Sequence, residues 1–516
     1  MSKFPLRPAV TGMSALLLAA TLTGCFSPGA GQTAEGGDGA GRIKLAMLQP
    51  PRSGLSPLSD DAFKLSRWKT AETLVELDEL GEAKPALATA WQQNDATTWR
   101  FALREGVQFH DGTAMTSAEA AASLTAAANA SPKPRILDGV ELTARADGPA
   151  AVVVSTAAPD PLLPQRLSSP QLAILAASAY KEGGTVSPVN AGTGPFRLVS
   201  VDGTSSARLD RFDGYWGEEA EADGVDVQFV PDGIARAAAI RTGGADIVEA
   251  IPVGQVARVD PALVHEVPMP RTNTLYLNTA SGPFADPAVR AAARNAVDAG
   301  TVVDRVYEGR ADQAEGLLGP ALPWAAGERK NDTYVEAMAG RVAATAVQGT
   351  PIRLGTFTDR AELPEVAVQL EQQLESAGFV VEQDVREYQH IEADALAGKF
   401  DAFILSRATV LDSGDPVAYL YSDFSCNGSF NISQFCDPGV DAALVKAAGI
   451  PAGPERRAAI AAAESLILAR DAAIPLLHER VIQGESSRVG GVERDPRERA
   501  LITGRTSVTG STGAKD

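Results

Sequence analysis

Histidine and cysteine are scarce in this chain, which has four histidines and three cysteines in 516 residues. Two of the histidines begin a His-Glu pair like that of the zinc motif HExxH. Met269 and Ile482 stand where the second histidine would be, so neither pair completes that motif. GxSxG, P-loop and CxxC motifs are also missing. We therefore predict no catalytic residue, no metal site and no cofactor, and we expect a binding protein rather than an enzyme.

Basic residues are in the minority. The chain has 46 Lys and Arg residues and 65 Asp and Glu residues, which gives a formal net charge of −19. This charge argues against a nucleic-acid partner and against a polybasic hold on anionic lipid. After the N-terminal segment, no apolar run is long enough to span a bilayer. With 45% hydrophobic and 22% charged residues, the composition is typical of a soluble globular protein, and the length predicts at least two lobes.

The N-terminus has the pattern of an export signal. Lys3 and Arg7 precede an apolar stretch, residues 10–22, that is too short to span a bilayer comfortably. The stretch ends in Leu22-Thr23-Gly24-Cys25, which resembles the bacterial lipobox. In that motif the cysteine thiol receives a diacylglycerol and becomes the first residue of the mature chain. A plain secretory signal with an incidental cysteine is the alternative.

The segment that follows, residues 25–41, is rich in glycine and alanine and too poor in aliphatic side chains to fold. We expect a flexible tether there, after a signal peptide that comprises residues 1–24. The lipobox then predicts a protein outside the cytoplasm, anchored to the outer face of the cell membrane by lipid on Cys25.

The other two cysteines, Cys426 and Cys436, are ten positions apart in a chain predicted to enter an oxidising compartment. We predict that they form a disulfide closing a short loop, which would contribute ~2–3 kcal/mol. A metal site is the alternative, but no histidine lies near them in sequence and two thiolates make an incomplete zinc site.

Strand-like and helix-like segments alternate along the first half. Residues 98–103 alternate apolar and polar side chains, and after a turn the alternation resumes at residues 107–109, which predicts a hairpin. Thr116 begins a capping box and so predicts a helix start. Asp232 and Asp286, the latter followed by proline, predict two more.

The second half has the clearest α/β pattern. A strand is expected at residues 352–355, a helix at 362–377, and further strands from about residues 379 and 400. Repeated strand–helix–strand units favour a parallel sheet with helices on both faces, so the fold class is α/β.

Several sequence blocks occur in a fixed order along the chain. They are residues 74–78, 85–91, 97–113, 192–196, 215–217, 275–278 and 286–290. Together they resemble the extracellular solute-binding proteins of family 5, which serve peptide and nickel ABC importers. We expect most of these residues to be architectural, with the glycines of 192–194 supplying turn conformations.

The resemblance implies a two-lobe clamp like that of periplasmic binding proteins, of the large type, with a ligand sealed between the lobes. Lobe I would comprise residues 42–270, with an extra subdomain at about 80–185. Lobe II would comprise residues 271–480, and residues 481–516 would return to lobe I.

Residues 411–416 and the cysteine pair after them resemble dipeptide-binding proteins, in which D-x-G-D-P precedes two similarly spaced cysteines. The resemblance implies that Asp412 holds the α-ammonium of a peptide, a charge-assisted bond that is strong between closed lobes. A turn aspartate is the alternative, although that description fits Asp415 better.

Dipeptide binders also carry an arginine just before the helix that corresponds to residues 362–377, where it captures the peptide carboxylate. Here Leu363-Pro364-Glu365 occupies that neighbourhood, and the nearest candidate is Arg360. Either Arg360 substitutes, or the far end of the ligand is not a free carboxylate at that distance, which leaves longer peptides open.

The resemblance thus implies a lipid-anchored receptor, expected to be a monomer, that captures a short peptide and delivers it to the permease of an ABC importer. Nickel, as a chelate, is the alternative ligand within the family. A secreted lipoprotein hydrolase and a non-transport receptor or chaperone on the same fold are alternatives from other classes.

Overall fold

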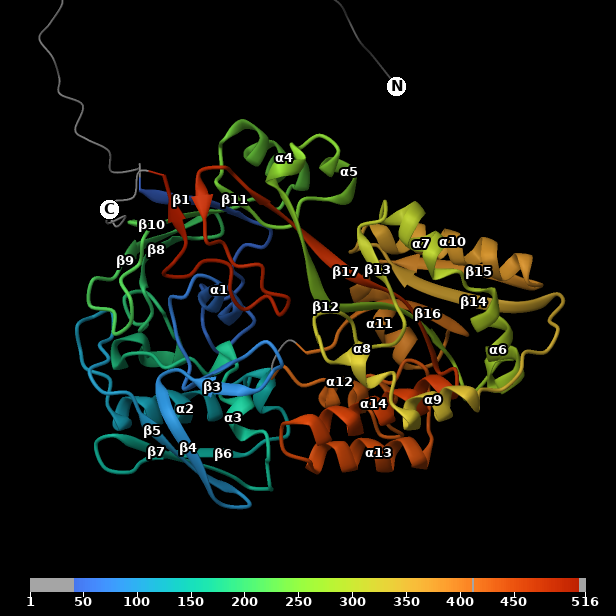
Figure 1. Ribbon diagram of the computed structural model, residues 1–516, viewed down its shortest axis with the longest axis horizontal. Coiled ribbons are helices and arrows are strands. Elements are labelled where there is room, and N and C mark those ends of the chain that lie inside the picture. The colour runs from blue at the N-terminus through green and yellow to red at the C-terminus, as the bar shows by residue number, and fades with distance from the viewer. Residues whose placement is uncertain (1–40, 411–412, 510–516) are drawn as a thin grey trace, which may run out of the picture. The chain divides into compact units, whose positions relative to one another are not determined.

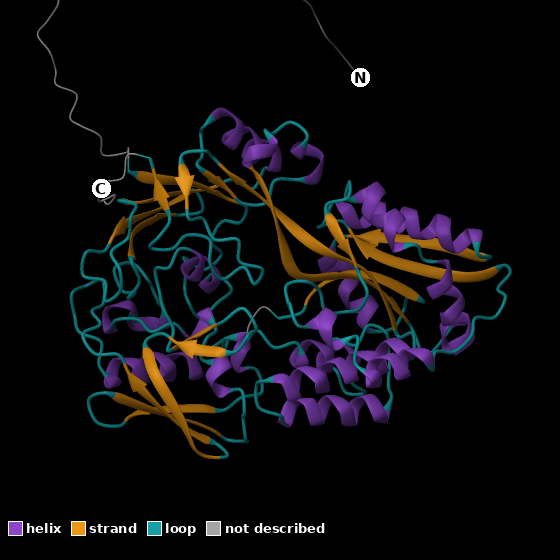
Figure 2. Cartoon of the chain, in the orientation of Figure 1, coloured by secondary structure: helices purple, strands orange, loops and turns teal. Residues whose placement is uncertain are grey.

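The computed structural model describes residues 41–410 and 413–509, all of which belong to the unit Gly39–Asp516 (Figure 1). The predicted signal peptide, Cys25, the predicted tether up to residue 40 and Asp412 lie outside the described residues. Within the described part, helices and strands mix as predicted (Figure 2). No described helix is both long and apolar enough to cross a membrane.

One large sheet has the strand order β15-β14-β16-β12-β17-β11-β1-β10-β9-β8, with β13 paired to β17. Its strands are β1 (Arg42–Met47), β8 (Phe196–Asp202), β9 (Ser206–Arg211), β10 (Gly224–Phe229), β11 (Ile247–Val248), β12 (Val264–Leu277), β13 (Ala311–Gln313), β14 (Thr350–Phe357), β15 (Phe379–Arg386), β16 (Ala402–Ala408) and β17 (Ala473–Glu485). As predicted for the second half, β14 is parallel to both β15 and β16.

Three smaller sheets accompany it. β4 (Ala88–Asp95), β5 (Thr98–Leu103), β7 (Ala151–Thr156) and β6 (Leu142–Ala146) form a four-stranded sheet in that order; β2 (Val75–Leu77) pairs with β3 (Ala83–Pro85), and β18 (Val489–Gly490) with β19 (Ser507–Val508).

The hairpin predicted between residues 98–103 and 107–109 is wrong. The first segment is a strand, β5, but it pairs with β4 and β7. The second segment turns back on itself instead, because the Phe109 N–H donates to the Thr113 carbonyl at 2.8 Å and the Met115 N–H to the Val107 carbonyl at 2.9 Å. Alternation identifies a strand but not its partner.

The α-helices are α1 (Ala62–Arg67), α2 (Ser117–Ala128), α3 (Leu163–Arg166), α4 (Gly233–Thr242), α5 (Val253–Val256), α6 (Pro287–Ala296), α7 (Ala299–Val306), α8 (Ala325–Glu328), α9 (Asp332–Ala339), α10 (Glu362–Ser376), α11 (Tyr388–Leu396), α12 (Val417–Phe424), α13 (Pro438–Gly449) and α14 (Pro454–Ala469). The three predicted N-caps are confirmed: Thr116 forms a capping box, and Asp232 and Asp286 accept hydrogen bonds from the first turns of α4 and α6.

Buried apolar side chains form two large clusters. The first core gathers side chains from β1, β5 and β7 to β10, together with Leu501, Ile502 and Val508 near the C-terminus. The second core gathers side chains from β14 to β16, the last part of β12 and the first part of β17, together with helices α6 to α14. Because the long strands β12 and β17 run side by side from one core toward the other, they join the two (Figure 1).

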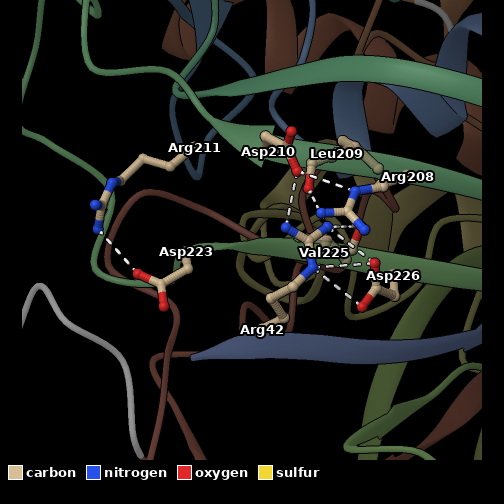
Figure 3. A network of polar contacts seen from close by, with 8 residues as sticks. All are labelled: Arg42, Arg208, Leu209, Asp210, Arg211, Asp223, Val225 and Asp226. Atoms are coloured by element: carbon tan, nitrogen blue, oxygen red, sulfur yellow. Dashed lines mark hydrogen bonds and ion pairs between the residues drawn. The ribbon is translucent and has the colours of Figure 1, made fainter. Parts of the chain in front are cut away.

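A buried arginine fixes the first strand of the sheet (Figure 3). Arg42, 5% exposed, donates through Nε and Nη2 to Asp226, through Nη1 to Asp210 at 2.8 Å, and through Nη2 to the Leu209 carbonyl at 2.7 Å. One guanidinium thereby ties β1 to both β9 and β10, close to where the predicted tether ends.

Two further predictions concern glycine and cysteine. Cys426 and Cys436 form the predicted disulfide. Neither Gly192 nor Gly194 has a positive φ, so the expected turn role does not explain why glycine occupies these positions. A Cβ on them would lie 2.0 Å from the Thr70 carbonyl oxygen and 1.9 Å from that of Lys69, so close backbone approach requires glycine at both positions.

Candidate functional site: a cavity lined from both cores

A cavity of about 1230 Å³ is lined mainly by segments that pack on the first core. These segments lie within residues 66–86, 215–221 and 493–505. Pro320, Ala321 and Pro323, which precede α8 on the second core, line it as well. The volume exceeds the roughly 300–1,000 Å³ of typical small-molecule sites, so the cavity admits a ligand of considerable size together with water.

A rigid aromatic wall belongs to this cavity. The buried Glu72 carboxylate accepts hydrogen bonds from the Tyr215 hydroxyl and from Trp216 Nε1, both at 3.0 Å. The guanidinium of Arg104 lies 4.0 Å from the centre of the Trp216 ring. Burial raises the pKa of Glu72 above its ordinary value, although the bonds from Trp216 and Tyr215 oppose this effect. Both aromatic rings are therefore held in fixed positions against the cavity.

Lysine side chains neutralise a second wall carboxylate. Lys69 Nζ lies 2.6 Å and Lys84 Nζ 3.3 Å from the oxygens of Glu76. Burial by itself would raise the pKa of Glu76, but the charges of the two ammonium groups bring it below its ordinary value. Glu76 is therefore an ionised carboxylate whose charge is already balanced.

The turn between β2 and β3 reaches from the first core to the second. Asp78 fixes the turn by accepting from the Leu80 and Glu82 N–H groups at 2.8 and 2.9 Å. Glu82 forms an ion pair of 2.5 Å with Arg457 on α14. Gly81 has a φ of +82°, and a Cβ there would lie 3.1 Å from the Gly414 carbonyl oxygen. Backbone contact and an ion pair thus cross between the cores at the edge of the cavity.

The loop of residues 495–502 forms another wall. The Asp495 carboxylate accepts from the N–H groups of Arg497, Arg499 and Ala500 at 2.8–3.0 Å. The N–H groups of Leu501 and Ile502 donate to the Arg67 carbonyl at the end of α1, at 3.1 and 2.9 Å. These bonds hold the loop on the first core and place Arg497, which is 8% exposed, at the cavity.

The residues predicted to bind the ligand have different locations. Asp412 lies outside the described residues. Its neighbour Asp415 is structural, because both of its oxygens accept from Arg456, at 2.6 and 3.0 Å, and one also accepts from the Val417 N–H. Arg360 does not line the cavity and donates to Glu479 at 2.9 Å.

Sequence reasoning missed Arg497, which carries no family motif. A turn signal, Asp495-Pro496, does precede it, but that signal says nothing about burial. Among the described residues, no group of three or more His, Cys, Asp or Glu side chains is arranged to hold a metal ion.

Residues 82–431 match the family described as bacterial extracellular solute-binding proteins, family 5. The nickel-binding periplasmic protein of Escherichia coli K12 is 29% identical over 269 residues, 49% of this chain and 51% of that protein. The glutathione-binding protein GsiB of Escherichia coli O1:K1 is 28% identical over 258 residues, 48% of this chain and 50% of that protein. The chain thus spans about half the length of these two relatives.

A longer match joins the chain to the probable di/tripeptide-binding protein 5 of Pseudomonas aeruginosa UCBPP-PA14, 26% identical over 461 residues, 82% of this chain and 87% of that protein. Among solved structures, the nickel ABC transporter of Bacillus halodurans has a TM-score of 0.78 at 25% identity over 90% of this chain and 100% of that one. The dipeptide-binding protein of Pseudoalteromonas sp. SM9913, in complex with Met-Leu, has a TM-score of 0.70 at 18% identity over 90% and 99% of the two chains, a likeness of fold.

The predicted family and the predicted two-lobe α/β fold class are both confirmed by these matches. The chain belongs to the bacterial extracellular solute-binding proteins of family 5.

Proposed function

We propose that this chain is the substrate-binding component of an ABC importer and that it captures short peptides for a membrane permease. The observation that carries the proposal is the charge pattern of the cavity. Carboxylates within residues 72–79 and guanidinium groups within residues 494–505 line the same space. A peptide with free termini carries one charge of each sign. The guanidinium groups can receive its carboxylate, whereas Glu72, Glu76 and Asp78 already have partners within the chain, so the ammonium requires a further carboxylate.

The relatives and the size of the cavity support the same ligand class. The relative matched over most of its length has a name that refers to di- and tripeptides. A volume of about 1230 Å³ leaves room for side chains and for bridging water, which allows different peptides to be accepted.

Asp412 is proposed to receive the α-ammonium of the peptide, as the resemblance to dipeptide binders implies. Support comes from the described end of its loop. A Cβ on Gly414 would lie 2.5 Å from Leu77 Cδ1, and Leu77 lines the cavity. Arg360 is a weaker candidate for binding the peptide carboxylate than Asp412 is for the ammonium, because Arg360 would have to give up its ion pair with Glu479 to bind the ligand.

Lipid on Cys25 is proposed to hold the receptor, as a monomer, at the outer face of the cell membrane. A tether confines a receptor near its permease and raises its effective concentration there. We expect Cys25→Ser to move the protein from the membrane fraction to the soluble fraction with peptide affinity unchanged. Loss of affinity together with release would contradict this separation of roles.

A nickel chelate is the second candidate ligand, because one relative is named for nickel binding and the Bacillus halodurans structure is titled a nickel ABC transporter. A chelate whose carboxylates face outward could use the same guanidinium groups of the cavity. Nickel in this proposal is cargo, carried by an organic ligand.

Thermal unfolding of the full chain carrying Cys25→Ser would test both candidates, with trialanine and with the nickel–histidine chelate as probes. A ligand at a hundred times its dissociation constant adds ~2.7 kcal/mol of apparent stability. We expect trialanine to stabilise the protein, Asp412→Asn to remove the effect, and the control Asp213→Asn, at an 84% exposed position, to preserve it.

Stabilisation by trialanine that survives Asp412→Asn unchanged would contradict the ammonium role. Stabilisation by the nickel chelate alone would contradict the peptide function. Mass spectrometry of the released probe separates a receptor, which returns the peptide intact, from a hydrolase.

A further inference from the structure

Buried arginines normally find acceptors within the protein, and this chain provides its own comparison. The described arginines that are less than 9% exposed are Arg42, Arg236, Arg290, Arg456 and Arg497. Arg236 donates to four backbone carbonyl oxygens and Arg290 to three. Arg456 donates to three carbonyl oxygens and to both oxygens of Asp415. With the network of Arg42, four of these five guanidinium groups have protein acceptors.

Arg497 is the exception. Within residues 41–410 and 413–509, no hydrogen bond or ion pair involves its guanidinium, and its Nη1 is buried without a partner. The adjacent Glu498 makes no hydrogen bond or ion pair with Arg497, and the carboxylate of Asp495, two residues away, accepts from three backbone N–H groups of the same loop. A buried guanidinium nitrogen without a partner is unfavourable, so Arg497 calls for an acceptor that the described chain does not supply.

The position of Arg497 is fixed before any ligand arrives. Its loop is held by Asp495 and by the Arg67 carbonyl, and its Nη1 lies 3.7 Å from where a Cβ of Gly81 would stand. Nη1 lies against the Gly81 turn, so Nε and Nη2 are the guanidinium nitrogens that remain free to donate. Arg497 lines the cavity. Such preorganisation reduces the entropy lost on binding.

We propose that Arg497 is the anion anchor of this cavity and that it receives a carboxylate of the ligand. The inference rests on the proposed function, under which this group is the C-terminal carboxylate of a peptide. A planar guanidinium with two free nitrogens matches a planar carboxylate. The C-terminal loop then supplies the carboxylate-binding arginine that the segment before α10 lacks. In that segment Arg360 is already paired with Glu479.

The test compares trialanine with its C-terminal amide, by calorimetric titration of the full chain carrying Cys25→Ser. We expect the free acid to bind about 30-fold more tightly than the amide, since losing one partner of a buried charged pair costs about 2 kcal/mol or more. Arg497→Gln should remove this preference, and Arg497→Lys should restore part of it. The control Arg145→Gln makes the same charge change at a 68% exposed position and should preserve the preference.

A second readout separates an anchor from a structural arginine. Without ligand, Arg497→Gln should unfold at the same temperature as the parent or higher, because the substitution removes an uncompensated buried charge. A merely structural arginine would give a lower unfolding temperature together with equal losses of acid and amide binding, and that result would overturn the proposal.

The outcomes distinguish the anchor from the proposed function. If acid and amide bind the parent equally, the peptide function stands and the anchor is wrong. The nickel–histidine chelate bears carboxylates of its own. If neither peptide binds, and the chelate binds the parent about 30-fold more tightly than it binds Arg497→Gln, the peptide function is wrong and the anchor stands. If the chelate binds without dependence on Arg497, both are wrong.

Discussion

Acidification should destabilise the first core through a single buried histidine. His110 is 5% exposed, and its Nε2 lies 2.8 Å from the Gly194 carbonyl oxygen, which can only accept, so Nε2 carries the hydrogen. Nδ1 is buried and has no partner among the described residues. Protonation would therefore place a charge and an unsatisfied donor in the core, next to the edge-on ring of Phe212.

Burial lowers the pKa of His110 from its ordinary 6.5 to about 4, with the positive charge of Arg197 acting in the same direction and the Gly194 carbonyl opposing it. Because the folded-state pKa lies below the unfolded one, the unfolded chain binds the proton first. The stability is fully present above pH 6.5 and is lost as the pH falls through 4. Between pH 7 and 4.5, these two pKa values correspond to a loss of about 2.4 kcal/mol.

Other buried groups also titrate in this range, so a matched variant is needed to isolate His110. The pKa of His478, in the second core, is likewise lowered by burial to about 4, and burial raises the pKa values of Glu72, Asp423 and Glu464, which favours the folded state in acid. His110→Gln removes one titration while its amide can still donate to the Gly194 carbonyl. His390→Gln, at a 67% exposed histidine, is the control.

Urea unfolding followed by tryptophan fluorescence is the assay, at pH 7 and pH 4.5. Tryptophan reports mainly on the first core, since Trp68, Trp91, Trp99 and Trp216 belong to it or pack on it, whereas Trp324 packs on the second. The parent and His390→Gln should lose about 2.4 kcal/mol more than His110→Gln over this interval. Equal losses within about 0.5 kcal/mol, a typical error of such extrapolations, would refute the reasoning.

Three further predictions concern stability. Arg42→Leu should cost about 2 kcal/mol in urea unfolding, because it removes the buried cation that joins the partly exposed Asp226 and Asp210, whereas Arg208→Leu, 52% exposed, should cost under about 1 kcal/mol; equal costs would contradict the role of the network. Replacing both Cys426 and Cys436 by alanine should cost about 2–3 kcal/mol from lost loop closure, and an unchanged unfolding midpoint would exclude that contribution. A double-mutant cycle on Glu82 and Arg457 should give a coupling of about 0.5 kcal/mol that decreases in salt, and a salt-independent coupling would point to packing instead.

Sequence alone predicted the features whose causes lie in adjacent residues. Thr116, Asp232 and Asp286 cap their helices through residues two or three positions away, so the sequence contains both partners of each interaction. The partner of β5 and the close contact of Gly192 with the Thr70 carbonyl depend on chain segments far apart in sequence. No local pattern encodes such distant contacts.

The same distinction between local and distant contacts applies to the candidate site. The sequence departs from dipeptide binders before α10 and leaves Arg360 as the nearest substitute for their carboxylate-binding arginine; in the structure Arg360 pairs with Glu479 from β17. The end of α1 and the Gly81 turn both pack against the loop of Arg497, and these residues are more than four hundred positions away from it in sequence. Spacing therefore identified the family, while the paired state of Arg360 and the unpaired state of Arg497 depend on tertiary packing.

The unpaired charge of Arg497 also links ligand binding to the contacts between the cores. The Gly81 turn touches Gly414 and, through Glu82, pairs with Arg457 of the second core, while the same turn covers Nη1 of Arg497. The turn that touches the second core therefore also covers a cation without a partner among the described residues, and a ligand carboxylate would compensate that charge. Since a ligand shifts a conformational equilibrium only by its differential affinity for the two states, a carboxylate on Arg497 would stabilise the arrangement in which this turn joins the cores. An amidated peptide would lack that effect, and its weaker binding would then reflect incomplete closure as well as a missing ion pair.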